Sequence, residues 1–116
     1  MAAPMSRGDV VLTRFPFTDL TGSAVRPALV VSAGLIGQDL VLAGISSVIR
    51  GPAIPTDLIV NIAHPEFRQS GLRVASVLRL HKLAAVESSV IIRRLGRIGP
   101  QLQTEVDRIL RLVLGL

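Results

Sequence analysis

Residues 26–47 read RPALVVSAGLIGQDLVLAGISS, and this stretch decides the fold. It holds two apolar runs rich in Val, Leu and Ile, at residues 26–32 and 39–47. The short connection between them contains Gly34 and Gly37. Short apolar runs bounded by turn-forming residues are typical of strands, so the stretch predicts two strands joined as a hairpin.

The segments on either side continue the β pattern. Upstream, GDVVLTRFPF at residues 8–17 predicts a strand, and TDLTGS at residues 18–23 predicts a loop. Downstream, three further strands are predicted at residues 57–62, 73–80 and 90–95. They are separated by turn-forming or polar connections at residues 51–55, 64–71 and 84–89.

The chain closes with a predicted amphipathic helix. Two glycines in residues 96–99 predict a break, and Pro100 suits a first helical position. Apolar residues then recur at helical spacing, at Leu102, Val106, Ile109, Leu110 and Val113. The expected fold class is mainly β with a C-terminal helix, a small barrel or curled sheet on which the helix packs, forming one domain over residues 1–116.

The composition points to an anionic partner. The 116 residues carry 13 Lys+Arg against 8 Asp+Glu, a formal net charge of +5, and every basic residue except Lys82 is Arg. Arg matches the geometry of phosphate oxygens, which favours nucleic acid, although a genome rich in G and C produces the same bias. With no Cys, disulfide scaffolds, thiolate metal sites and cysteine nucleophiles are excluded.

No membrane segment, metal site or cofactor motif is expected. The longest uncharged run, residues 27–38, is shorter than the roughly 18–20 residues that a spanning helix needs. The N-terminus lacks a secretory pattern, so a cytoplasmic location is expected. His64 and His81 have no Cys or paired carboxylate beside them, and they are interpreted as a loop residue and a strand-end residue.

Short motifs follow one another in order from about residue 7 to residue 114. They are GDVVL (8–12), PFTDLTGS (16–23), RPALVVS (26–32), LVLAGISS (40–47), IPTD (54–57), GL (71–72), SVLRLHKL (76–83) and IIRRLGRI (91–98). Their order and spacing resemble the PemK/MazF family of toxin endoribonucleases. The resemblance implies an SH3-like barrel that forms a homodimer, cuts single-stranded RNA at selected sequences without a metal or cofactor, and is silenced by a cognate small acidic antitoxin.

The resemblance also assigns site residues. The family's functional arginine, in an Arg-Pro pair, corresponds to Arg26, which precedes Pro27. Its functional hydroxyl, usually Thr, corresponds to Ser46 in Ile45-Ser46-Ser47. Serine keeps the hydroxyl but lacks the methyl group that stiffens threonine.

Further substrate-binding candidates are Asp19, Pro27, Ser47, His81 and Lys82. Asp19 is also the candidate proton acceptor nearest to Arg26 in sequence, although Asp followed soon by Gly, here Gly22, is an ordinary turn composition. His81 and Lys82 suit phosphate contacts, and they also suit a solvated strand end. Phe15, Phe17 and Phe67 are expected to fill core or interface space rather than to stack on bases.

The implied chemistry uses the RNA 2′-OH as the nucleophile. Attack on the adjacent phosphorus expels the 5′-oxygen and leaves a 2′,3′-cyclic phosphate, so the protein must supply alignment and positive charge. Arg26 suits the charge, but a guanidinium stays protonated near neutral pH and is not expected to be the general base. Ser46 suits a phosphate oxygen or the orientation of the guanidinium.

Two departures from the family pattern and two alternatives remain. The loop before Arg26 is shorter than in well-studied members, and Ala84 stands where many members carry Arg.

One alternative is a non-catalytic toxin of the same fold that binds a protein such as DNA gyrase. The other is a decayed toxin whose groove binds partners without cutting RNA.

Overall fold

The computed structural model describes residues 5–14, 25–49, 51 and 53–116. Within these residues, six strands form one antiparallel sheet in the order β4-β5-β3-β2-β1-β6. The elements in chain order are β1 (Asp9–Thr13), β2 (Arg26–Val30), β3 (Asp39–Ser46), β4 (Asp57–Val60), α1 (Phe67–Ser70), β5 (Ser76–Glu87), the 3₁₀ turn η1 (Ser88–Val90), β6 (Ile91–Arg97) and α2 (Pro100–Leu114).

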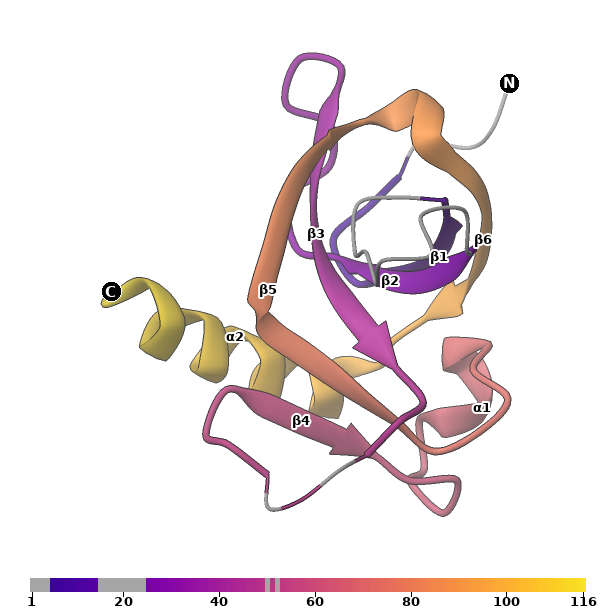
Figure 1. Ribbon diagram of the computed structural model, residues 1–116, viewed down its shortest axis with the longest axis vertical. Helices are drawn as coiled ribbons and strands as arrows, with labels where there is room; N and C mark the ends of the chain where they lie inside the picture. Colours follow the sequence, from indigo (N-terminus) through magenta and orange to yellow (C-terminus); the bar gives the residue numbers. More distant parts are fainter. Residues whose placement is uncertain (1–4, 15–24, 50, 52) are drawn as a thin grey trace.

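The sheet is strongly curled around its central strands. Strands β2 and β3 pair antiparallel, which confirms the predicted hairpin. The long strand β5 pairs with β3 along its length and with β4 at its beginning. Figure 1 shows β5 passing up one side of β1–β3 and β6 returning down the other side, where β6 pairs with β1. The predicted mainly β fold with a closing helix is therefore confirmed.

Both faces of the central strands are buried. One face packs against α2, and its core includes Val10, Leu29 and Leu80. Phe67 packs against this core, as expected, whereas Phe15 and Phe17 lie outside the described residues. The other face lines the inside of the curl with Val30 and other aliphatic side chains. Strands covered on both faces read as continuous apolar runs, which explains a hydrophobic content of 49% in a small chain.

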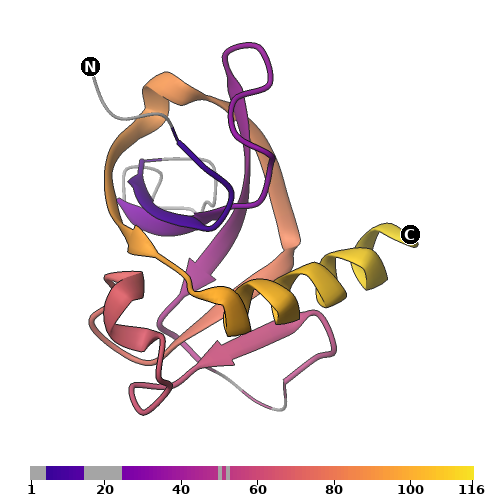
Figure 2. The ribbon, with the colours of Figure 1, turned by 180° about the vertical axis from the view of Figure 1, so that it is seen from behind.

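The helix α2 crosses the back of the sheet, as Figure 2 shows. Its N-terminus is capped by a residue that is distant in sequence. The buried carboxylate of Glu66 accepts hydrogen bonds from the backbone N–H groups of Gln101 and Leu102, each at 2.8 Å. The first N–H groups of a helix have no partner within the helix itself. A negative charge at this end also interacts favourably with the positive end of the helix dipole. Glu66 thereby ties the segment before α1 to the start of α2.

Two connections predicted from the sequence are wrong. Residues 84–87 were expected to connect two strands because Ala and Glu are weak strand formers. Instead they extend β5, where pairing with Asp39–Leu42 of β3 outweighs local preference. Gly96 was expected to break the chain but pairs with Val10 inside β6. The other strand ends are corrected slightly: β4 ends at Val60, and β5 begins at Ser76.

Gly71 and Gly96 allow two backbone segments to touch. Gly71 caps α1 with φ +77°, and a Cβ at this position would lie 2.2 Å from the carbonyl oxygen of Leu95. A Cβ on Gly96 would lie 2.3 Å from the carbonyl oxygen of Gln69. Glycine within a strand often marks such a close approach. The turn after α1 therefore rests directly on β6 because neither glycine has a side chain.

An ion pair joins the N-terminal segment to α2 and gives a pH-dependent prediction. Arg7 binds both the Asp107 carboxylate and the Val31 carbonyl, and Gln103 also donates to Asp107. Burial raises the pKa of Asp107, but the hydrogen bonds from Gln103 and Arg7 and the charges of Arg7 and Arg111 hold it below its ordinary 3.8. A carboxylate whose pKa is lower in the folded state than in the unfolded state stabilises the fold when the pH is above its unfolded-state pKa. This contribution is lost as the pH falls through its folded-state pKa.

We therefore expect Asp107→Asn to lower the free energy of unfolding at pH 7. The loss should be below about 1 kcal/mol because the pair is partly exposed. The difference from the unchanged protein should shrink as the pH falls below 3.8. Urea denaturation across this range measures it, and a constant difference at every pH would contradict the assignment.

Candidate functional site

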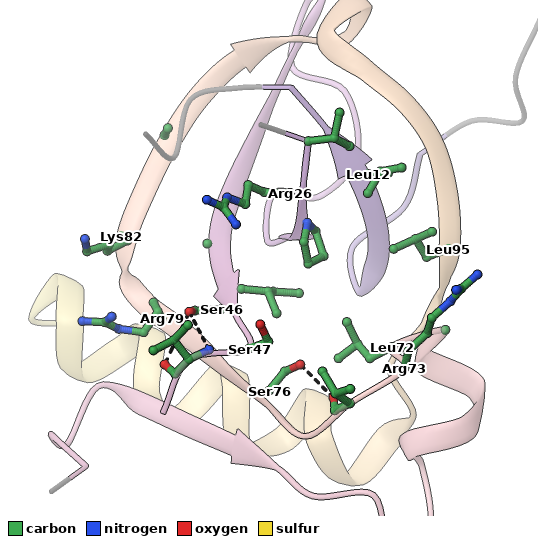
Figure 3. Close-up of a pocket in the computed structure, with 18 of the residues that line it drawn as sticks. Leu12, Arg26, Ser46, Ser47, Leu72, Arg73, Ser76, Arg79, Lys82 and Leu95 are labelled. Atoms are coloured by element: carbon green, nitrogen blue, oxygen red, sulfur yellow. Dashed lines mark hydrogen bonds between the residues drawn. The ribbon is translucent and has the colours of Figure 1, made fainter. Parts of the chain in front are cut away.

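Arg26 and Ser46 lie at the ends of neighbouring strands and face the same groove. The β2–β3 register ends with Ala28 opposite Gly44, and continuing it by two residues sets Arg26 opposite Ser46. Opposite residues in a sheet point to the same face. Both side chains line an open groove of about 900 Å³, and Figure 3 shows them between β5 and the side chains of Leu72 and Leu95.

The Ser46 hydroxyl is held in place by the backbone that follows it. Its Oγ accepts a hydrogen bond from the Val48 N–H at 3.1 Å and lies 3.4 Å from the Val48 carbonyl oxygen. A hydroxyl has one hydrogen to donate and two lone pairs to accept with. Because the Val48 N–H occupies one lone pair, the oxygen is fixed, and its hydrogen can turn from the long Val48 contact to an incoming phosphate oxygen.

Four of the other sequence candidates line this groove. Pro27 and Ser47 do so beside Arg26 and Ser46, and His81 and Lys82 do so from β5. The His81 Nδ1 is 3.1 Å from the Thr56 hydroxyl oxygen, which orients the ring. Asp19 lies outside the described residues.

An irregularity in β5 brings His81 and Lys82 to the groove. On β3, Ala43 pairs with Leu83, but its neighbour Gly44 pairs with Arg79, so residues 80–82 of β5 have no pairing partner on β3. Such bulges bend a strand and redirect its side chains. Both His81 and Lys82 are exposed, whereas Leu80 is fully buried in the core.

The sequence reasoning missed Arg79, which also lines the groove. Its Nε donates to the Asp57 carboxylate at 2.9 Å, and its side chain is 31% exposed. Period-two spacing offers a signal, because Arg79 and His81 belong to one face of a regular strand. Ala84 lines the groove as well.

The groove is strongly basic. Among the described residues that line it there is no Asp or Glu. Its cationic side chains are Arg26, Arg73, Arg79, Lys82 and Arg93. A concave surface of one charge sign concentrates ligands of the opposite sign, so this groove suits a polyanion. Within the described part of the chain, no group of three His, Asp or Glu residues is placed to hold a metal ion.

Solved structures show which fold this is. The chain superposes on an endoribonuclease from a mycobacterial species in complex with its cognate antitoxin, at 22% identity and TM-score 0.71, covering 98% of this chain and 97% of that one. It also matches a chain of the MazE-MazF crystal structure from Deinococcus radiodurans, at 21% identity and TM-score 0.72, covering 98% of this chain and 99% of that one. A third match is the Mycobacterium tuberculosis toxin MazF-mt6, at 14% identity and TM-score 0.69, covering 93% of this chain and 97% of that one. The fold is that of the MazF-like toxins.

The family follows from the sequence itself. Residues 6–114 match the family model described as PemK-like, MazF-like toxin of type II toxin-antitoxin system. The chain therefore belongs to the PemK/MazF family of type II toxins. No curated protein matches it at a significant level. None of the helices in the described residues has the length and apolar character to cross a membrane.

Proposed function

We propose that this toxin is an endoribonuclease that cuts single-stranded RNA at selected sequences, acting as one domain over residues 1–116. The observation that carries the proposal is the position of Arg26 and Ser46 on one face of the sheet, in an open basic groove. A guanidinium and a hydroxyl together suit a phosphodiester, since one supplies charge and the other a directed hydrogen bond.

In the proposed reaction, the RNA supplies its own nucleophile. The 2′-oxygen attacks the neighbouring phosphorus and loses its proton, while the bond from phosphorus to the 5′-oxygen breaks. The products are a 2′,3′-cyclic phosphate and a 5′-OH that takes up a proton. Arg26 binds the non-bridging oxygens, where negative charge develops, and a single preorganised donor contributes about 3–4 kcal/mol to such stabilisation.

Ser46 and the remaining candidates align the strand. The fixed Ser46 oxygen presents its hydrogen to a phosphate oxygen, which limits the directions from which the 2′-oxygen approaches. Ser47, Pro27, His81 and Lys82 contact the sugar and phosphates on either side. Asp19 remains the proposed proton acceptor on the grounds of sequence alone.

The partners proposed are single-stranded RNA, a small acidic antitoxin and a second copy of the chain. Next to the groove cations stand exposed aliphatic side chains, Val25, Val48 and Val74. An acidic segment with apolar anchors matches both features. Aliphatic residues are exposed on other elements too, among them Ile36, Ile62 and Leu112. The homodimer itself is proposed from the family resemblance.

The experiment that tests the proposal is digestion of mixed RNA by the purified protein in the presence of EDTA. We expect fragments that begin with 5′-OH and end with 2′,3′-cyclic phosphate, cut at a limited set of sequences. End-specific labelling and sequencing of the fragments measure both features. Intact RNA in the presence of well-folded protein, or cleavage that stops when metal is chelated, would contradict the proposal.

A further inference from the structure

Arg79 stands beside the Arg26–Ser46 pair on the same face of the sheet. Gly44 is opposite Ala28 on one side and opposite Arg79 on the other, so the Arg26–Ser46 face also carries Arg79. Ser46 pairs with Val77, which makes Arg79 its diagonal neighbour. Diagonal neighbours lie about 7–8 Å apart, within reach of a long side chain. Gly44 adds no side chain between them.

Asp57 holds the Arg79 guanidinium on the β4 side of the groove. The bond from Nε to the carboxylate fixes one edge of the planar group. Among the described residues, the terminal amino groups of Arg79 have no hydrogen-bond partner. Figure 3 shows the guanidinium of Arg79 pointing away from Arg26 and from the centre of the groove, so the two guanidinium groups suit different phosphates rather than one.

A second cavity continues from the groove past Arg79. It has a volume of about 340 Å³ and shares Ser46, Val48 and Arg79 with the groove. Its walls combine aliphatic side chains, among them Ile54 and Ile59, with the paired Asp57 and Arg79. Because Arg79 lines both the groove and this cavity, a strand that ran from one to the other would pass close to its guanidinium.

We propose that Arg79, positioned by Asp57, binds the phosphate next to the scissile one and directs the strand into the second cavity. The inference rests on the proposed function, since it takes the scissile phosphate to lie between Arg26 and Ser46. It assigns Arg79 to substrate binding and Asp57 to positioning. Removing Arg79 should therefore weaken RNA binding more than it slows cleavage of bound RNA.

The test measures binding of an oligonucleotide that carries 2′-deoxyribose at the cleavage site, so that it cannot react. We expect Arg79→Gln to weaken binding by about tenfold and to reduce the slope of log affinity against log salt by about 0.7, the value for one phosphate contact on a single strand. Arg79→Lys should recover part of the affinity. Arg108→Ala, which removes an equal charge from the exposed face of α2, should change neither quantity.

The Asp57→Asn variant separates the effect of orienting the Arg79 guanidinium from the effect of its charge. This variant keeps the Arg79 charge but loosens its hold, so we expect a severalfold weaker affinity with an unchanged salt slope. If Arg79→Gln leaves an unpaired carboxylate that prevents folding, the double variant Arg79→Gln/Asp57→Asn removes that charge and answers the same question. Circular dichroism of each variant checks the fold.

Two results would overturn the inference. The first is an Arg79→Gln variant that binds as tightly as Arg108→Ala. The second is unchanged binding with a large fall in kcat, which would place Arg79 at the reacting phosphate. Cleavage of RNA by the unchanged protein, assayed in parallel, reports on the proposed function separately, because the binding measurement needs no reaction.

Discussion

Arg26→Ala should reduce the rate of RNA cleavage by about 10²–10³-fold while leaving the fold intact. Arg26 is exposed at the start of β2, so its side chain adds little to the core. Its removal withdraws a preorganised charge from the developing phosphorane, and the loss of one such donor has an effect of this size. Single-turnover cleavage at saturating protein measures the rate of the chemical step directly.

Arg26→Lys and Ser46→Ala are compared with Arg26→Ala to separate the effects of charge, donor geometry and the hydroxyl. Lysine keeps the charge but lacks the planar pair of donors, so we expect it to restore little of the rate. Ser46→Ala removes the hydroxyl and should lower the rate by a smaller factor. The alternative of a non-catalytic toxin that binds a protein target predicts a different result. The Arg26→Ala variant would then stay lethal, and the purified unchanged protein would not cut RNA.

Gly71→Ala should lower the free energy of unfolding by about 3 kcal/mol. Part of this loss, about 1 kcal/mol, comes from forcing an alanine into the left-handed conformation at φ +77°. The rest comes from contact between the new Cβ and the Leu95 carbonyl, which neither backbone segment can avoid without moving. Urea denaturation measures the change.

Gly37→Ala is the matched control for the close approach. Gly37 also has a positive φ, +62°, but a Cβ there meets no atom within 4 Å. We expect it to lower the free energy of unfolding by about 1 kcal/mol, the conformational part alone. Equal losses for Gly71→Ala and Gly37→Ala would show that the contact with β6 contributes nothing.

The central hairpin could be predicted from local sequence, because two apolar runs flank a short connection that contains Gly34 and Gly37. The register that sets Arg26 opposite Ser46 came from the structure. The helix was equally clear, because Leu102 and Val106 repeat at helical spacing after a proline. The roles of Arg26 and Ser46, by contrast, came from the family resemblance.

The features that the sequence did not reveal depend on contacts between distant residues. The residues near Ala84 and Gly96 do not indicate that each pairs with a strand that is distant along the chain. The irregularity in β5 is likewise invisible in the sequence, because it arises where that strand meets β3. The orientation of Arg79 also depends on a distant residue, because the Asp57 carboxylate that binds it lies 22 residues away along the chain.

The burial of β2 and β3 on both faces has a consequence for how such toxins diversify. The guanidinium and hydroxyl proposed for the reaction project from two strands whose neighbouring residues are buried on both faces. The groove walls, by contrast, also include Val48, Arg73 and Val74 in connecting segments. On the proposed function, changes in those segments would alter which bases are accepted without moving the reacting groups. One scaffold would thus acquire new sequence preferences by mutation while its chemistry is inherited unchanged.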